Sequence, residues 1–334
     1  MTPLVTILVP TIGARLAYLP DTMRSIADQT FTDFEVKILD NASPEPAHAR
    51  FVAWAATDRR IEVLRVPERV PQFENFNRGI LASRGRYVAF MHDDDVYRPR
   101  YLEAQLALLE THPACGIAGS NYDFVDGNGE VTERRHWIKK TEVWSGKRYI
   151  TNLLSRGRNC IPMPGIVYRK EVFGGRGFDL DVPPYFGDFV LLMRMAETWD
   201  LAVVEEAVVG VRRHEGQESL SMPFSRAFEY RTRVLKDYCA EYYARHPEDV
   251  RFMRQLERRV DLVHRIAMMW GWLNADSAVE ALACAEKYPV TKGRLVDDGV
   301  ATLLRTLAPR YGESRVRPKN VLGLARRISG TLGV

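Results

Sequence analysis

Short apolar runs alternate with amphipathic segments along the N-terminal part of the chain. Four runs place apolar residues on both faces and are rich in β-branched types, which predicts strands buried between helices. They cover residues 5–9, 34–40, 61–66 and 87–91. Between them, apolar residues recur at helical spacing and predict helices over 19–29, 47–56 and 73–83. This alternation predicts an α/β fold with a mostly parallel sheet, flanked by helices and joined by right-handed crossovers.

The pattern changes after residue 98 and again after about residue 222. In the middle we expect one helix over 99–111, a hairpin tip at 126–129, an irregular segment at 159–165, and extended runs at 115–122, 166–168, 201–204 and 207–209. Long helical segments follow over 224–245, 249–272, 277–287 and 291–307. We therefore predict an α/β domain over 1–222, in two parts (1–98 and 99–222), and an α-helical region over 223–334. That region packs on the first domain or forms a homodimer interface.

Composition narrows the classes of function. A formal net charge of +4 over 334 residues is too small to indicate nucleic-acid binding. The four cysteines are widely spaced without a CxxC pair, which argues against a zinc site or a disulfide framework. The N-terminus has no basic segment of a signal peptide, and no stretch reaches the roughly 18 apolar residues that span a bilayer. These features predict a cytoplasmic protein.

The last residues of the chain are basic. Tyr311 to Val334 carries Arg315, Arg317, Lys319, Arg326 and Arg327 among apolar positions. Two interpretations stay open for this tail. It lies peripherally on the anionic inner face of the membrane, where lipid-linked acceptors reside, or it is a solvated terminal helix.

Three adjacent carboxylates, Asp93, Asp94 and Asp95, follow the apolar run that ends at Met91. Like charges held together at a strand end require a cation or strong hydrogen-bond donors nearby. Mg²⁺ or Mn²⁺ suits carboxylate ligands, and either ion could hold a phosphate there. The alternative is an Asp-rich turn that caps the helix beginning near Pro99.

Two further polar strand ends are expected at the same edge of the sheet. Pro10 and Thr11 follow the first strand, and Asp40 and Asn41 follow the second. In open α/β sheets, ligands bind at the carboxyl ends of the strands. Asp40 would accept a hydrogen bond from a base or ribose, or would simply form an Asx turn. Neither GxGxxG after the first strand nor GxxxxGK[ST] occurs, so Rossmann-type dinucleotide binding and P-loop chemistry are disfavoured.

The segment VTILVPTIGARLAYLPDTMRSIADQTFTDFEVKILDNAS, with its Ser25, Gln29 and Thr30, resembles the opening of glycosyltransferase family 2. FMHDDDVYRP falls where that family carries its DxD region, and the resemblance extends over roughly residues 3–220. It implies a GT-A fold and an inverting transfer of a sugar from a nucleotide-diphosphate sugar to a hydroxyl of a saccharide or lipid-linked acceptor, with Mn²⁺ or Mg²⁺.

The resemblance also assigns roles to individual residues. Asp188, which the pattern alone would make a helix N-cap, becomes the catalytic base. Asp94 becomes the principal metal ligand, with Asp95 and with His214 from a segment similar to the family's R-x-H…S pattern. His92 replaces the first Asp of the D-x-D-D pattern. The expected nucleotide-sugar contacts are Pro10, Thr11, Asp40, Asn41, Arg69, Asn77, Asp93 and Asp94.

Two departures from the family pattern leave the nucleoside open. Ile12 stands where many members carry a Tyr, and Asn41 stands where many carry a second Asp. Both weaken the case for uracil, so thymidine and guanosine donors stay open. Two other classes are alternatives. One is a non-catalytic carbohydrate-binding protein with a transferase-like fold. The other is a sugar-1-phosphate nucleotidyltransferase, for which the segment from Pro10 to Arg15 is a poor match.

Overall fold

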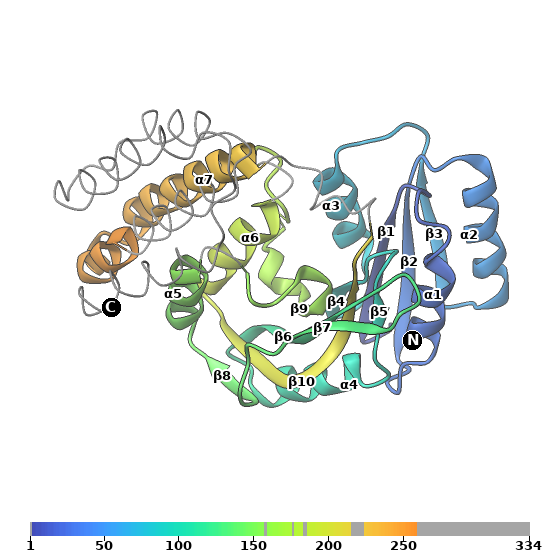
Figure 1. Ribbon diagram of the computed structural model, residues 1–334, viewed down its shortest axis with the longest axis horizontal. Helices are drawn as coiled ribbons and strands as arrows, with labels where there is room; N and C mark the ends of the chain where they lie inside the picture. Colours follow the sequence, from blue (N-terminus) through green and yellow to red (C-terminus); the bar gives the residue numbers. More distant parts are fainter. Residues whose placement is uncertain (1, 157–158, 176, 183–185, 215–223, 259–334) are drawn as a thin grey trace, which may run out of the picture. The chain divides into compact units, whose positions relative to one another are not determined.

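The computed structural model describes residues 2–156, 159–175, 177–182, 186–214 and 224–258. The chain divides into two compact units, residues 1–221 and 222–334. The first unit is built around one sheet with helices on its faces (Figure 1). The predicted fold class, a mostly parallel α/β sheet flanked by helices, is confirmed.

The described residues form a ten-stranded sheet in the order β3-β2-β1-β4-β9-β6-β10-β5, with β7 paired to β6 and β8 paired to β10. The strands are β1 (Val5–Thr11), β2 (Phe34–Asn41), β3 (Ile61–Val66), β4 (Tyr87–Phe90), β5 (Val96–Tyr97), β6 (Cys115–Val125), β7 (Val131–Arg135), β8 (Glu142–Trp144), β9 (Ile166–Arg169) and β10 (Asp200–Arg212). The first four strands pair in parallel, and so do β6 and β10. β9 runs antiparallel between β4 and β6.

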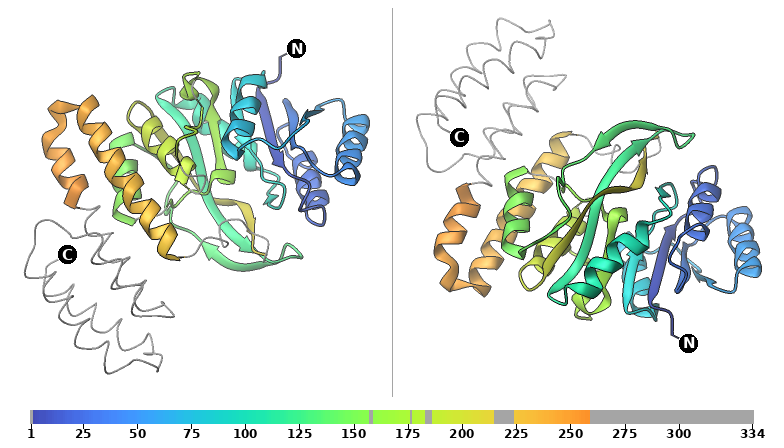
Figure 2. Two further views of the ribbon diagram at one scale, coloured as in Figure 1. Left: turned by 90° about the horizontal axis from the view of Figure 1, so that it is seen from above. Right: turned by 90° about the horizontal axis from the view of Figure 1, so that it is seen from below.

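Both faces of the parallel part are covered by helices, which explains its continuous apolar runs. The helices of the first unit are α1 (Leu19–Ala27), α2 (Glu45–Thr57), α3 (Gln72–Ala82), α4 (Tyr101–Thr111), α5 (Gly146–Arg156) and α6 (Gly187–Ala196), with short 3₁₀ turns η1 (Met163–Gly165) and η2 (Lys170–Phe173). Helices α1, α2 and α4 share one core with Ile7, Val9 and Ile38. α3 packs on the opposite face, and α2 lies at the β3 edge of the sheet (Figure 2).

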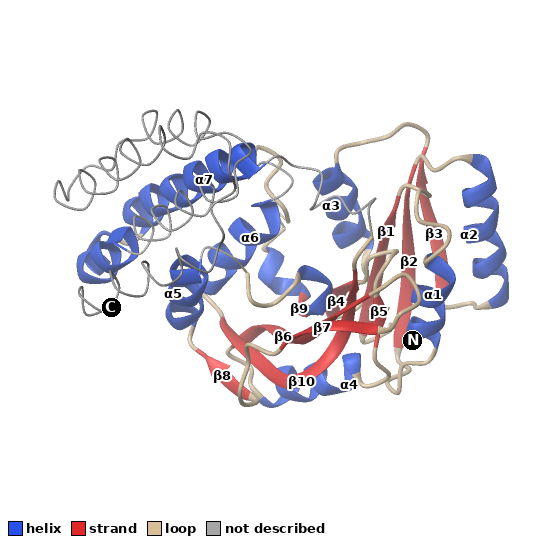
Figure 3. Cartoon of the chain, in the orientation of Figure 1, coloured by secondary structure: helices blue, strands red, loops and turns tan. Residues whose placement is uncertain are grey.

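Residues 200–212 differ from the sequence prediction. Two short extended runs were expected, whereas β10 is one long curved strand (Figure 3). Its pairing with β6 shifts register between Val204 and Ala207, around the exposed Glu205 and Glu206. These two charged residues interrupt the apolar pattern, and the irregularity keeps both outside the core without ending the strand. The short strand β5 was also missed, because two residues carry too little periodicity to be recognised.

The second unit begins with α7 (Phe224–Arg245), which matches the predicted helix, followed by η5 (Pro247–Asp249). Residues 250–258 are helical and form the first part of the predicted helix 249–272. The predicted helices 277–287 and 291–307 and the basic tail 311–334 lie outside the described residues. Within the part of the chain that is described, no helix is both long and apolar enough to cross a membrane.

Candidate functional site

The strand register brings three polar positions together at the carboxyl end of the sheet. Thr11 pairs with Asp40 of the neighbouring strand β2. On the other side, Leu8 of β1 pairs with Phe90, the last residue of β4. Continuing that register by three residues places Thr11 beside Asp93, and the Thr11 hydroxyl donates a 2.6 Å hydrogen bond to Asp93 Oδ2. The predicted convergence of the first, second and fourth strands therefore occurs.

Asp93, Asp94 and Asp95 are all buried, with exposed fractions of 1%, 6% and 3%. Burial raises the pKa of Asp93, and the charge of Arg15 opposes this rise. Burial also raises the pKa of Asp95 well above its usual range, with a further contribution from the Asp94 charge. The cluster thus carries an electrostatic cost that a bound cation would relieve.

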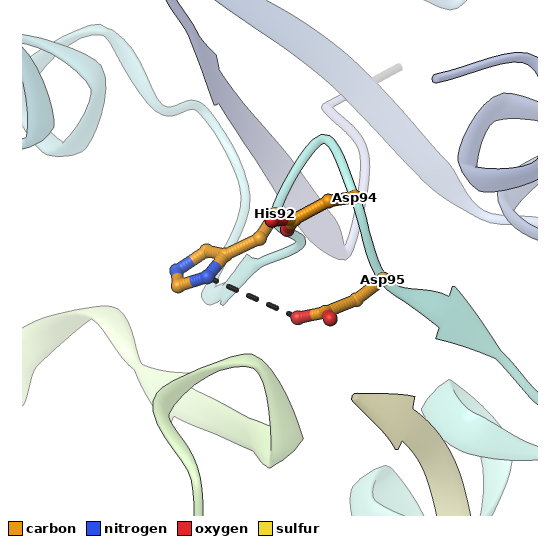
Figure 4. Close-up of side chains that lie close together, drawn as sticks. All are labelled: His92, Asp94 and Asp95. Atoms are coloured by element: carbon orange, nitrogen blue, oxygen red, sulfur yellow. Dashed lines mark ion pairs between the residues drawn. The ribbon is translucent and has the colours of Figure 1, made fainter. Parts of the chain in front are cut away.

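The side-chain oxygen and nitrogen atoms at this turn fit the ligands of a divalent metal ion. His92, Asp94 and Asp95 each present one ligand atom, and these atoms lie within 4.8 Å of one another. Figure 4 shows the His92 ring beside the Asp95 carboxylate, with 3.9 Å between Nδ1 and Oδ2. Carboxylate oxygens with one imidazole nitrogen suit Mn²⁺, and Mg²⁺ with added water. From the sequence, His92 was only a departure from the family pattern, so its place among these candidate ligands was missed.

His214, predicted as a metal ligand, contacts the cluster by a different route. Its Nε2 lies 3.0 Å from Asp94 Oδ2. The His214 ring also packs on Tyr18, with ring centroids 5.0 Å apart. His214 thus contacts the Asp94 carboxylate directly and helps to orient it. The histidine in the group of mutually close ligand atoms is His92, not His214. Its role as a ligand stays a prediction.

Arg212 is fully buried behind the cluster. Its backbone N–H donates to Asp95 Oδ1 at 2.9 Å, and its guanidinium donates to the carbonyl oxygens of Asp94, Asp126 and Gly127 at 2.7–2.9 Å. The guanidinium also lies over the Tyr18 ring. Arg212 therefore ties the acidic turn to the β6–β7 hairpin and supplies a permanent positive charge near it.

Arg212→Lys is expected to lower the free energy of unfolding by about 3–5 kcal/mol. A lysine ammonium cannot replace the planar fork, so buried carbonyl groups would lose their donors. Urea denaturation measures the change. Arg213→Lys is the matched control, because Arg213 is exposed and pairs with Glu133 at the surface. Its effect should stay within about 1 kcal/mol. An Arg212→Lys protein as stable as the control would contradict this assignment.

Asp40 and Asn41 already have protein partners. The Asp40 carboxylate accepts the Ser43 N–H at 2.8 Å and lies 2.7 Å from His48 Nδ1. The Asn41 side chain makes two 2.9 Å hydrogen bonds with the backbone of Val70. These bonds fix the loops that follow β2 and β3, at the edge where a nucleoside was predicted. Asp40 and Asn41 therefore have structural roles, and the predicted contacts of these two residues with a nucleoside would be additional to them.

Three other residues, Asn77, Arg69 and Pro10, were predicted to contact the nucleotide-sugar donor. The Asn77 amide bonds in both directions to the backbone of Phe178, at 2.7 and 2.8 Å. It therefore connects α3 with the segment that leads toward α6. Arg69 is exposed in the loop between β3 and α3, and Pro10 lies inside strand β1. The structure thus brings Thr11, Asp93 and Asp94 together but gives Asn77 a different partner.

Asp188 lies in the first turn of α6, as the second residue of the helix and two positions after the N-cap. The N-cap is Phe186, so the capping interpretation of Asp188 was wrong. Gly187 begins the helix against α3, where a Cβ atom would overlap the Phe73 ring. Asp188 Oδ1 accepts the Phe189 N–H at 2.8 Å. Burial raises the pKa of Asp188 to about 6, and its charge contributes to the raised pKa values of the buried Tyr149 and Tyr168. A carboxylate with such a pKa is suited to accept a proton near neutral pH.

Comparison with known proteins shows which family the chain resembles. Residues 6–175 match the model of the family described as "Glycosyl transferase family 2". An uncharacterized glycosyltransferase of Methanocaldococcus jannaschii is 25% identical over 45% of this chain and 53% of its own. The putative teichuronic acid biosynthesis glycosyltransferase TuaG of Bacillus subtilis is 29% identical over 40% of this chain and 52% of its own. The chain spans about half the length of these curated relatives.

Solved structures share the fold at lower identity. A fragment of S. aureus TarS in complex with UDP-GlcNAc has a TM-score of 0.63 and 17% identity, covering 83% of this chain and 77% of that one. The mannosyltransferase PcManGT from Pyrobaculum calidifontis, in complex with GDP-Man and Mn²⁺, has a TM-score of 0.55 and 16% identity, covering 92% and 81%. Because the family model spans half of the sequence, the chain belongs to glycosyl transferase family 2, and its fold is of the GT-A type.

Proposed function

We propose that this protein is an inverting glycosyltransferase that moves a sugar from a nucleotide-diphosphate sugar to a hydroxyl of a saccharide or glycolipid acceptor. The observation that carries the proposal is a pair of features with complementary chemistry. One is the buried acidic turn at the sheet edge, whose donor set fits a divalent ion. The other is Asp188, whose pKa of about 6 suits a general base.

In this proposal His92, Asp94 and Asp95 hold Mn²⁺ or Mg²⁺, with His214 supporting Asp94. The ion would act as a Lewis acid that stabilises the charge of the leaving diphosphate. Pro10, Thr11, Asp40, Asn41, Arg69, Asn77 and Asp93 are the proposed donor-site residues. Among them, Thr11 and Asp93 have the strongest support, because they meet directly beside Asp94.

Asp188 would accept the proton of the acceptor hydroxyl while the oxygen of that hydroxyl forms a bond to the anomeric carbon. The bond between that carbon and the diphosphate oxygen breaks in the same step, and the nucleoside diphosphate leaves with the electron pair. Attack opposite the leaving group inverts the anomeric configuration, so no second carboxylate nucleophile is needed. A single base with a raised pKa agrees with this requirement.

The similar proteins support the class of donor and acceptor. The TarS and PcManGT structures hold UDP-GlcNAc and GDP-Man, the second with Mn²⁺. Relatives are named for teichuronic acid and O-antigen biosynthesis. We therefore propose a role in polysaccharide assembly, carried out in the cytoplasm. A purely carbohydrate-binding protein would not need a carboxylate whose raised pKa suits it to accept a proton.

A panel of nucleotide-diphosphate sugars, tested by thermal unfolding with Mn²⁺ or with EDTA, would identify the donor. We expect one nucleotide class to raise the melting temperature by a few degrees in Mn²⁺ and far less in EDTA, because ligands that bind the native state stabilise it. The matching nucleoside monophosphate serves as the control, since it lacks the second phosphate. No stabilisation by any donor at millimolar concentration would contradict the proposed function.

A further inference from the structure

Arg15 lies in the turn between β1 and α1, close to the acidic turn. Gly13 sets the direction of this segment with a φ of +70°, and a Cβ atom there would come within 2.7 Å of Ala47 Cβ. The Gly13 N–H donates to the Thr11 hydroxyl at 3.0 Å. The chain therefore turns back over the sheet edge and carries the Arg15 side chain, which is only 23% exposed, toward Asp93 and Asp94.

The Arg15 guanidinium bridges these two carboxylates. Nη1 lies 3.0 Å from Asp93 Oδ1, and Nε lies 3.2 Å from Asp94 Oδ2. Arg212 is also near, but its side chain is committed to carbonyl oxygens, and its described carboxylate contact is Asp21 at 3.4 Å. In the part of the chain that the structure describes, Arg15 is therefore the arginine that pairs directly with Asp93 and Asp94.

Asp94 thus belongs to two sets of contacts. One is the group of close ligand atoms with His92 and Asp95. The other is the ion pair with Arg15, which occupies Asp94 Oδ2 together with His214. A guanidinium and a divalent cation repel each other, so both cannot bind the same carboxylate oxygen at short range. An arginine on a partly exposed loop can move, and its planar fork matches a phosphate as well as a carboxylate.

We infer that Arg15 is a displaceable counter-ion of the acidic turn. Without a bound metal ion, its single positive charge offsets part of the negative charge of Asp93 and Asp94. Arg15 leaves Asp94 when a divalent cation binds there, and then turns to the diphosphate of the donor. This inference rests on the proposed function, because it assumes the metal and diphosphate site at Asp94. Arg15 would weaken metal binding as long as its guanidinium pairs with Asp94. Because the diphosphate of the donor offers the guanidinium another anion, metal and nucleotide would bind cooperatively.

Calorimetric titration with Mn²⁺ alone tests the competition. If Arg15 occupies Asp94 in nine of ten molecules, its removal should tighten the apparent affinity about tenfold. We therefore expect Arg15→Gln to bind Mn²⁺ about tenfold more tightly than the natural protein. Arg50→Gln is the matched control, since Arg50 is exposed on α2 and its loss makes the same change in net charge. Its Mn²⁺ affinity should stay within about twofold of the natural protein.

Nucleoside diphosphate binding in saturating Mn²⁺ should change in the opposite direction. Arg15→Gln should weaken it by about tenfold, because a charge-assisted contact with phosphate is lost. A direct readout comes from the Arg15 Nε–Hε resonance, assigned by its absence in Arg15→Gln. Titration with Mg²⁺ should shift this resonance as the ion pair with Asp94 breaks.

Asp94→Asn separates failure of this inference from failure of the proposed function. Loss of Mn²⁺ binding in Asp94→Asn, together with unchanged Mn²⁺ affinity in Arg15→Gln, would overturn the role of Arg15 and leave the metal site standing. Unchanged Mn²⁺ binding in Asp94→Asn would overturn the metal site and the inference with it. An Arg15 resonance that does not move while Mg²⁺ saturates the protein would also overturn the inference.

Discussion

Asp188→Asn is expected to lower the rate of sugar transfer by about 10²- to 10⁴-fold while donor binding persists. An amide has the shape of the carboxylate but cannot accept the proton of the acceptor hydroxyl. In the natural protein, transfer should fall about tenfold for each pH unit below about 6, because Asp188 is then protonated. This acid limb should disappear in Asp188→Asn. The rates are measured with the donor that the panel identifies.

A stability measurement shows whether this loss reflects chemistry or damage to the fold. The pKa of Asp188 is raised from 3.8 to about 6, so the native state binds this proton more tightly than the unfolded chain does. The ionised side chain therefore costs stability as the pH rises from about 4 to about 6. Asn avoids this cost, and Asp188→Asn should be more stable at pH 7.5 by at most about 3 kcal/mol.

The gain should shrink at pH 5, where much of Asp188 is protonated in the native state. Asp181→Asn is the control, because Asp181 is exposed in the segment before α6 and should change neither rate nor stability. A large loss of stability in Asp188→Asn at neutral pH would contradict the account, because it would make the carboxylate a structural group.

Asp94→Asn is expected to abolish detectable Mn²⁺ binding and to weaken donor binding by about 10²-fold or more. Asp94 contributes to the group of close ligand atoms and contacts both Arg15 and His214. Removing its charge weakens a site for a divalent ion, since such ions require anionic oxygen ligands. Titration calorimetry with Mn²⁺, and then with the donor in Mn²⁺, measures both effects.

Asp28→Asn provides a matched control for Asp94→Asn, because Asp28 is exposed at the end of α1. Both changes remove one negative charge, so a general effect of net charge would appear in both. Only Asp94→Asn should lose Mn²⁺. Donor binding that is equally strong in Mn²⁺ and in EDTA, for the natural protein and for Asp94→Asn, would contradict metal assistance.

The residues that meet at the carboxyl edge of the sheet could be predicted from the sequence, because the sequence signals for the strands and their ends are local. A run such as Tyr87 to Phe90 is too apolar to be exposed, and parallel pairing then brings the ends of β1, β2 and β4 to one edge. Thr11, Asp93 and Asp94 could therefore be predicted to meet. The strand register explains why these residues meet. Thr11 pairs with Asp40 on one side, and on the other side it lies beside Asp93, to which it donates a hydrogen bond.

The contacts that bring distant segments together could not be predicted in this way. Nothing in the local pattern distinguishes Arg15 from a solvated loop arginine, yet a single glycine turns it onto Asp93 and Asp94. Arg212 follows an apolar run, and nothing in the local pattern marks its side chain as buried. It is fully buried because carbonyl groups of two other segments converge on its guanidinium. Such contacts depend on the packing of the whole domain.

In the proposed mechanism, Asp94 binds the donor through a metal ion, whereas Asp188 acts only in the chemical step. The most direct test is donor affinity in saturating Mn²⁺, measured by calorimetry for Asp94→Asn and Asp188→Asn beside the natural protein. This mechanism predicts that Asp188→Asn binds the donor within about threefold of the natural protein, while Asp94→Asn loses about 10²-fold or more in donor affinity. Equal affinities in the two variants, or loss of donor binding in Asp188→Asn, would contradict it.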